Sequence, residues 1–255
     1  MQPEDGPREG TEVEIPSDRD GIDAHILGIA ALAEPIRRRL YRFVVAQGAP
    51  VSREEAATGA DVAHHVAKFH LDKLVDDGLL EVEYSRPPGR GGPGAGRPAK
   101  RYRRSSSEVA VSLPQRHYEL AGRLLAGAVV EATSGGVPVD EALSRGARDE
   151  GRALGQQVHE LAGADADPEG LVAATIGVLS DCGYEPRPDG CEVTMANCPF
   201  HALAQDYTEL VCGMNLELMR GLLDGLGERV LDARLDPGPD RCCVRLCTVE
   251  STTAV

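Results

Sequence analysis

The spacing of the apolar residues changes between positions 52 and 104, and this pattern constrains the fold more than any other feature. Ser52 and Glu55 have the spacing of a capping box at the start of a short helix, which Gly59 ends. A longer helix is expected over residues 61–77, and Gly78 suits its C-terminal cap. The three- and four-residue spacing predicts that this helix buries Val62, Val66, Phe69 or His70, Leu74 and Val75.

The residues after Gly78 alternate between apolar and polar side chains, as in a half-buried strand running from Leu79 to Tyr84. A returning strand is expected from Lys100 to Arg104, after a loop rich in Gly and Pro. Two helices joined by a short glycine-containing turn and followed by a hairpin indicate a winged helix-turn-helix. Two further helices are expected before it, and the second of these begins at Pro35.

Charge is distributed unevenly along the chain. The net charge of -14 taken alone argues against a nucleic-acid binder. However, residues 25–117 carry 15 basic and 10 acidic side chains, and residues 86–104 hold seven cations and no acid. A basic patch can bind DNA even in an acidic protein, because each neutralised phosphate releases counterions. The middle third of the chain therefore fits DNA binding.

Candidate DNA contacts come from the longer helix and from the hairpin loop. The N-terminal half of a recognition helix reaches the base edges, which favours base reading by His64 and His65, with Lys68 beside them. The alternative is that these are solvated surface residues. In the wing, phosphate contacts are expected from Arg90, Arg97, Lys100 and Arg101.

The run HHVAKFHLDKLVDDGLLE, followed by GRPAKRYRR, resembles the winged-helix repressors of the ArsR-like group. The resemblance covers roughly residues 25–105. It implies a homodimer that binds double-stranded operator DNA. Members of this group sense metals, redox state or other ligands through varied sites, so this part of the chain does not identify the signal.

The rest of the chain is predicted to form an α/β sensor domain, which makes the fold class α+β. We expect a disordered acidic tail over residues 1–22, the winged helix over 23–112, a connecting and dimerisation helix over 113–135, and the sensor domain over 136–255. Within the sensor domain, helices are expected near 139–162, 169–181 and 202–226, and strands near 184–187, 191–197, 230–235 and 242–248.

All seven cysteines lie after residue 180, which favours metal, cluster or redox chemistry there, because the cytosol keeps thiols reduced. Cys198 follows a predicted strand, Cys212 lies in the next helix, and Cys242 and Cys243 lie in the last strand. Thiolates are soft ligands that suit iron-sulfur clusters, zinc or Cu(I). The closely paired spacing of a zinc finger is missing, which argues against structural zinc. Ordinary buried thiols are the favoured interpretation of Cys182, Cys191 and Cys247.

The stretch NCPFHALAQDYTELVCGMNLELMRGLLDGLG, with CC further on, resembles the sensor domain of SufR-type iron-sulfur repressors. This resemblance implies a [4Fe-4S] cluster, control of cluster-assembly genes, and a response to redox stress or nitric oxide. It also implies that Cys198, Cys212 and one of Cys242 and Cys243 are cluster ligands. The fourth ligand stays open between the other member of that pair, Cys182, His201, a carboxylate and a small molecule.

Other functional classes find little support in the sequence. Phosphate-binding glycine loops, zinc-protease motifs and nucleophile elbows are missing, and Cys198 with His201 lacks an orienting acid. Neither an enzyme nor a small-molecule substrate is therefore expected. No stretch reaches the ~18 apolar residues of a membrane span, which predicts a cytoplasmic protein without a membrane partner. The alternatives to a cluster are a thiol switch or a zinc or Cu(I) site, or a small-molecule-binding or catalytic domain joined to the winged helix.

Overall fold

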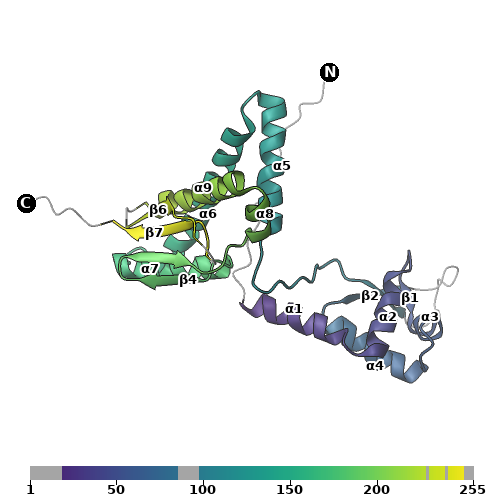
Figure 1. The fold of residues 1–255 in the computed structure, drawn as a ribbon. Helices are drawn as coiled ribbons and strands as arrows, with labels where there is room; N and C mark the ends of the chain where they lie inside the picture. Colours follow the sequence, from purple (N-terminus) through teal and green to yellow (C-terminus); the bar gives the residue numbers. More distant parts are fainter. Residues whose placement is uncertain (1–18, 86–97, 228–229, 239–240, 250–255) are drawn as a thin grey trace, which may run out of the picture. The chain divides into compact units, whose positions relative to one another are not determined.

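The computed structural model describes residues 19–85, 98–227, 230–238 and 241–249. The chain divides into two compact units, residues 1–111 and residues 112–255, and each is described by itself (Figure 1). Most of the predicted acidic tail, residues 1–18, lies outside the described residues, and a helix already begins at Arg19.

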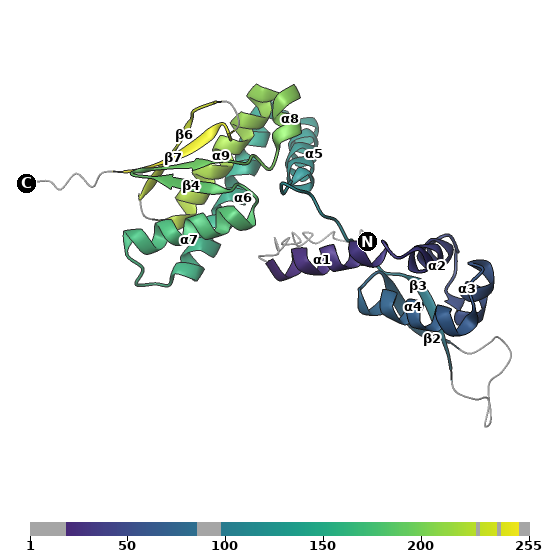
Figure 2. The ribbon, with the colours of Figure 1, turned by 60° about the horizontal axis from the view of Figure 1, so that its bottom comes forward.

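Over its described residues, the first unit combines four helices with a small antiparallel sheet, in the order β1-β3-β2. Tyr102 of the central strand lies opposite Val51 on one side and Val82 on the other. Helices α3 and α4 form the helix-turn-helix, and β2 with β3 forms the hairpin of the wing (Figure 2). The elements are α1 Arg19–Ala31, α2 Pro35–Val45, β1 Val51–Ser52, α3 Arg53–Gly59, α4 His64–Asp76, β2 Leu80–Ser85 and β3 Ala99–Arg104.

The residues predicted to begin α3 and to end α4 are confirmed, but α4 begins later than predicted. Ser52 and Glu55 form both hydrogen bonds of the capping box at the start of α3. Gly78 has a φ of 71°, which is the left-handed backbone expected after α4. However, α4 begins at His64, three residues later than predicted, because Asp61 also takes a left-handed backbone with a φ of 51° and prolongs the turn.

Of the side chains predicted to be buried by the longer helix, Leu74 is buried, and Val62 and Val75 pack against the core. The residues that enter the core are Ala67, Leu71 and Leu74, which pack with Leu40 of α2 and with Tyr102. Of the predicted pair, His70 is mostly covered beside Glu34, whereas Phe69 is 68% exposed. Phe69 is therefore not a core residue. The predicted set of buried residues also left out Ala67 and Leu71.

The second unit places a four-stranded sheet against stacked helices. The strands pair antiparallel in the order β4-β5-β7-β6. Helix α9 packs on this sheet, α6 packs on α9, and both α5 and α7 pack on α6. The elements are α5 Tyr118–Gly135, α6 Val139–Ala162, α7 Pro168–Asp181, β4 Pro186–Asp189, β5 Glu192–Met195, α8 His201–Asp206, α9 Thr208–Leu226, β6 Leu231–Leu235 and β7 Val244–Thr248.

Helices α6 and α9 approach each other so closely that only glycine fits at the crossing. A Cβ atom on Gly151 would lie 2.0 Å from the carbonyl oxygen of Leu218, and one on Gly221 would lie 2.1 Å from that of Arg148. Gly155 and Gly225 repeat this arrangement one helical turn further along. The crossing holds α9 rigidly against α6, and α9 carries one of the candidate site residues.

Two predicted elements of this unit differ in detail. The helix expected over residues 202–226 is two helices, because Tyr207, with φ -131° and ψ 52°, interrupts the helical backbone between α8 and α9. The pair Cys242 and Cys243 precedes β7 instead of lying in the strand. The second difference leaves Cys242 and Cys243 in the connection that leads into β7.

Candidate functional site

The exposed side of α4 carries the side chains predicted to contact DNA. His64, His65 and Lys68 are all exposed. Phe69 joins them, since positions 65, 68, 69 and 72 share one face of a helix. A Phe in this position can contact the methyl group of thymine. Phe69 was not among the predicted contacts, because its apolar side chain suggested the core. The polar residues His65, Lys68 and Asp72, which share its face of the helix, were the signal that could have placed it on the surface.

One predicted wing cation is bound within the first unit. The Nζ atom of Lys100 donates a hydrogen bond to the carboxylate of Asp72 on α4, and it lies 5.1 Å from the centre of the Tyr102 ring. The hydroxyl group of Tyr102 also donates to Asp72, at 2.9 Å. Burial raises the pKa of Asp72, but the hydrogen bonds from Lys100 and Tyr102 outweigh it and hold this pKa below its ordinary value. Lys100 thus fastens the wing to the recognition helix.

The other predicted wing cations have different positions. The guanidinium of Arg101 donates to the backbone oxygen of Pro50 at 2.8 Å and lies 3.8 Å from the carboxylate of Glu55. Arg103 and Arg104, which were not among the predicted contacts, are exposed at the end of β3, and Arg103 donates to the carboxylate of Glu81 at 2.8 Å. Arg90 and Arg97 lie outside the described residues.

Four cysteines from three separate parts of the second unit meet at one place. Cys198 follows β5, Cys212 lies in α9, and Cys242 and Cys243 precede β7. The thiol of Cys242 interacts with the thiols of both Cys198 and Cys243, and the thiol of Cys243 interacts with that of Cys212. We call these four residues the thiol cluster. Cys198, Cys212 and one of Cys242 and Cys243 were predicted as ligands, and the other member of that pair was one of the candidates for the fourth.

A cavity of about 280 Å³ opens onto the thiol cluster. Cys198, Cys212 and Cys243 line it, together with His201 and Arg241. Cys242 does not line this cavity and is only 2% exposed. A ligand that enters the cavity would therefore meet three thiols directly, with the fourth buried next to them.

The surroundings raise the pKa of three of these thiols, those of Cys198, Cys212 and Cys242. The pKa of Cys198 is raised by its hydrogen-bonding interaction with Cys242 and by burial. The pKa of Cys242 is raised to about 11, because the interaction with Cys243 and burial outweigh the opposing interaction with Cys198. Among the described residues, no group of three or more His, Cys, Asp or Glu side chains is arranged, as the side chains stand, to hold a metal ion. A cation that converts thiols to thiolates would have to reorient them.

The remaining cysteines lie apart from this cavity. Cys182 is buried at the end of α7, where burial raises its pKa to about 12. Cys191 is exposed before β5, and Cys247 is partly exposed on β7. His201, the other candidate for a ligand, lines the cavity, and its Nε2 atom is 3.1 Å from the side-chain nitrogen of Gln205.

A network of hydrogen bonds ties the Cys198 loop to the segment that precedes α5. The guanidinium of Arg116 donates to the side-chain oxygen of Asn197 and, at 3.2 Å, to the backbone oxygen of Cys198. The amide of Asn197 donates to the backbone oxygen of Gln115 at 3.0 Å, and the backbone N–H of His117 donates to that of Pro199 at 3.1 Å. We call this network the Arg116 joint. Sequence analysis missed it because Arg116 and Asn197 are 81 positions apart.

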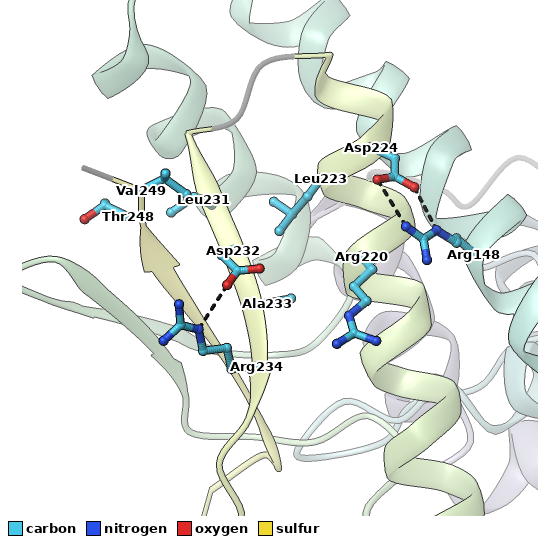
Figure 3. Close-up of a pocket in the computed structure, with 10 residues that line it drawn as sticks. All are labelled: Arg148, Arg220, Leu223, Asp224, Leu231, Asp232, Ala233, Arg234, Thr248 and Val249. Atoms are coloured by element: carbon cyan, nitrogen blue, oxygen red, sulfur yellow. Dashed lines mark hydrogen bonds and ion pairs between the residues drawn. The ribbon is translucent and has the colours of Figure 1, made fainter. Parts of the chain in front are cut away.

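A second and larger cavity, of about 690 Å³, lies where α6 and α9 meet the edge strand β6 (Figure 3). Its arginines are paired with carboxylates: Arg148 with Asp224 at 2.8 Å, and Arg234 with Asp232 at 3.0 Å. The third arginine of the lining, Arg220, is paired with Glu217 at 2.7 Å. Charged side chains at a sheet edge also protect it from pairing with another chain.

A winged helix-turn-helix with an exposed recognition helix defines a class of DNA-binding transcriptional regulators. Comparison with known families supports this class, because residues 32–83 match a family described as a helix-turn-helix domain. Within the part of the chain that the structure describes, no helix has the length and apolar character needed to cross a membrane.

Comparisons of the whole chain add little. No curated protein sequence matches it. Among solved structures, it is similar to human N-acetylserotonin methyltransferase in complex with SAM, with 17% sequence identity and a TM-score of 0.23. This match covers 64% of the present chain and spans 55% of the methyltransferase chain. A likeness at this level carries no argument about fold or activity.

Proposed function

We propose that the protein is a homodimeric transcriptional repressor whose affinity for operator DNA is controlled by a [4Fe-4S] cluster at the thiol cluster. The observation that carries this proposal is the meeting of four cysteines, from positions 198, 212, 242 and 243, three of which line one cavity. In the proposed cytoplasmic setting, thiols stay reduced and are available as ligands. Control of cluster-assembly genes and a response to redox stress or nitric oxide belong to the same proposal.

The donor set suits an iron-sulfur cluster in its chemistry. Cys198, Cys212 and Cys243 would bind it from the cavity, and Cys242 is the nearest further thiol. Iron-sulfur clusters are held by cysteine thiolates and change their charge or come apart on oxidation. Because the pKa values of Cys198 and Cys242 are raised, binding as thiolates would release protons from these two residues.

DNA recognition would be performed by the exposed side of α4. His64, His65 and Phe69 are proposed to read base edges, and Lys68 is proposed to bind a phosphate. Arg90, Arg97, Lys100 and Arg101 were predicted as wing contacts, and Lys100 would act mainly by holding the wing in place through Asp72.

The Arg116 joint gives the thiol cluster a route to the DNA-binding unit. The two units divide between residues 111 and 112, only a few residues before Gln115 and Arg116. A change in the backbone of Cys198 would therefore act on the segment that leads to the first unit, through Asn197 and Arg116. We propose that an occupied site fixes this segment and that the empty site releases it and the DNA.

The second copy of the chain is proposed to pack on α5. Two of the charged side chains on this helix point toward α6, since Arg123 pairs with Glu150 and Glu131 pairs with Arg145. The exposed side carries apolar and small residues instead, with Val129 and Val130 exposed on it. A symmetric dimer would place two recognition helices on the two halves of a palindromic operator.

Anaerobic purification tests the proposed cofactor. The wild-type protein and a Cys191→Ser control should contain iron and acid-labile sulfide in equal amounts, because Cys191 is exposed and lies apart from the cavity. Cys198→Ser and Cys212→Ser should lose both. Zinc without sulfide would support the metal-site alternative, and reversible oxidation without metal would support a thiol switch. A colourless wild-type protein that still binds operator fully would contradict the cluster.

A further inference from the structure

A hydrogen-bonded chain of buried polar groups ends on one sulfur atom of the thiol cluster. Asn215 lies on α9 with no exposed surface. Its side-chain oxygen accepts a hydrogen bond of 2.6 Å from the hydroxyl group of Tyr184, and its side-chain nitrogen donates one of 3.2 Å to Sγ of Cys242. We call these two hydrogen bonds the Asn215 relay.

Ordinary helix packing does not require an Asn at this position. Burying an amide costs free energy unless both ends find partners, and Asn is a weak helix former. One partner here is the phenol of Tyr184, which is itself only 1% exposed and lies edge-on to Phe200, with 6.5 Å between the ring centres. The phenol is a donor to Asn215, which leaves the amide N–H group to point at sulfur. The hydrogen bond from Tyr184 therefore fixes the orientation of the Asn215 side chain.

Cys242 also contacts two other members of the thiol cluster, Cys198 and Cys243, and Cys243 in turn contacts Cys212. The backbone of Cys242 is held as well, because its N–H group donates to the backbone oxygen of Met195 at 2.9 Å. A group that orients Cys242 therefore influences the whole set of thiols. Residues outside the ligand set commonly orient metal ligands and tune the metal in this way.

We propose that Asn215 is a positioning residue that orients Cys242 Sγ and withdraws electron density from it, and that Tyr184 holds Asn215 in the required orientation. This inference rests on the proposed function, since it concerns the same thiol cluster. Hydrogen bonds to the sulfur atoms are one of the factors that set the reduction potential of an iron-sulfur cluster. A donor favours the more negative, reduced state, so removing it should lower the midpoint potential.

The experiment compares the reconstituted full-length wild type with Asn215→Leu, Tyr184→Phe and Thr175→Val. Thr175 is a matched control, because its hydroxyl is equally buried in the same unit but donates to the backbone oxygen of Leu171, within α7. Asn215→Leu should shift the reduction equilibrium about tenfold toward the oxidised state, which is 59 mV for a one-electron couple. Tyr184→Phe should shift it in the same direction by less. Thr175→Val should leave the potential unchanged even if it lowers the melting temperature.

Two measurements separate the failure of this inference from that of the proposed function. Iron and sulfide counts in the wild type test whether the protein holds an iron-sulfur cluster. If it does, equal midpoint potentials in the wild type and Asn215→Leu at equal cluster content would overturn the Asn215 relay but not the proposed function. If the wild type holds no cluster, Co²⁺ is the probe. The sulfur-to-cobalt charge-transfer band should then move to lower energy in Asn215→Leu, because the sulfur regains electron density. An unmoved band, or a wild type that binds no Co²⁺, would overturn the relay as well.

Discussion

The two units present their chemically important side chains in opposite ways. The first unit exposes them, since His64, His65, Lys68 and Phe69 all project from the outer side of α4. The second unit buries its own, since Cys212, Cys242 and Asn215 are covered. An exposed set can be altered without loss of the fold, whereas a buried set depends on the packing around it. The two units should therefore respond differently to substitution.

The largest effect is expected at the crossing of α6 and α9. Gly221→Ala places a Cβ atom 2.1 Å from the backbone oxygen of Arg148, so the helices must separate. We expect a loss of about 3 kcal/mol in the stability of the second unit. Thermal unfolding followed by circular dichroism should show a lower transition for this unit and an unchanged one for the first.

Gly127→Ala in α5 is the matched control, because a Cβ atom there meets nothing within 4 Å. It should leave the stability unchanged or raise it by about 1 kcal/mol, since Ala favours a helix over Gly. Equal melting temperatures for Gly221→Ala and Gly127→Ala would show that the crossing is not the rigid support described above.

The next effect concerns DNA binding by the first unit. Phe69→Ala should weaken binding to a selected duplex about tenfold, or 1.4 kcal/mol, if Phe69 meets a base. Lys68→Ala should weaken binding to all duplexes and reduce the salt dependence by about one phosphate contact. Fluorescence anisotropy at several salt concentrations measures both.

Lys73→Ala is the control on the same helix. Lys73 is exposed, but its ammonium group binds the carboxylate of Asp77 at 2.7 Å, so it should matter little for DNA. If Lys73→Ala lowered the affinity as much as Lys68→Ala, the contact side of α4 would be assigned wrongly.

Periodicity predicted most of the first unit. The capping box at Ser52, the turn at Gly78 and the wing strands were all visible, because they depend on neighbours within a few residues. The boundary of α4 was missed because nothing local signals a left-handed Asp61. The assignment of Phe69 failed for a related reason, since residue type favoured the core and the true stripe began at Ala67.

The second unit was predicted less completely. Its helices were found from their apolar spacing, but the hydrogen bond from the buried Asn215 was not. The partner of that bond, Cys242, follows 27 positions later and only the fold brings it near. The same holds for Arg116 and Asn197. Contacts between polar residues that are distant in the sequence leave no periodic pattern.

A smaller effect is expected at the Arg116 joint, where the change concerns the link between the units. Arg116→Gln removes donors to Asn197 and Cys198 but leaves the thiols in place. We expect normal iron and sulfide contents with a DNA affinity that no longer depends on them. Arg187→Gln, on the exposed strand β4, should keep the dependence. An Arg116→Gln protein that responds like the wild type would exclude this route.

The smallest effect is a pH dependence in the first unit. Hydrogen bonds from the backbone and side chain of Ser106 lower the pKa of Glu81 from 4.5 to about 2. A lowered pKa in the folded state stabilises the fold above the unfolded value, and this contribution is lost as the pH falls from about 4.5 through about 2. The difference in melting temperature between the wild type and Glu81→Gln should be constant near pH 7 and disappear toward pH 2. A difference in melting temperature that stays constant down to pH 2 would contradict the lowered pKa of Glu81.

The most direct test of the account is the operator affinity of one anaerobic preparation before and after its iron is removed by chelation. A duplex selected from a random pool by the iron-loaded protein serves as the operator. We predict that iron removal weakens binding at least about tenfold, which corresponds to a coupling free energy of about 1.4 kcal/mol. Equal affinities in the two states would contradict the claim that the buried thiols of the second unit control the exposed helix of the first.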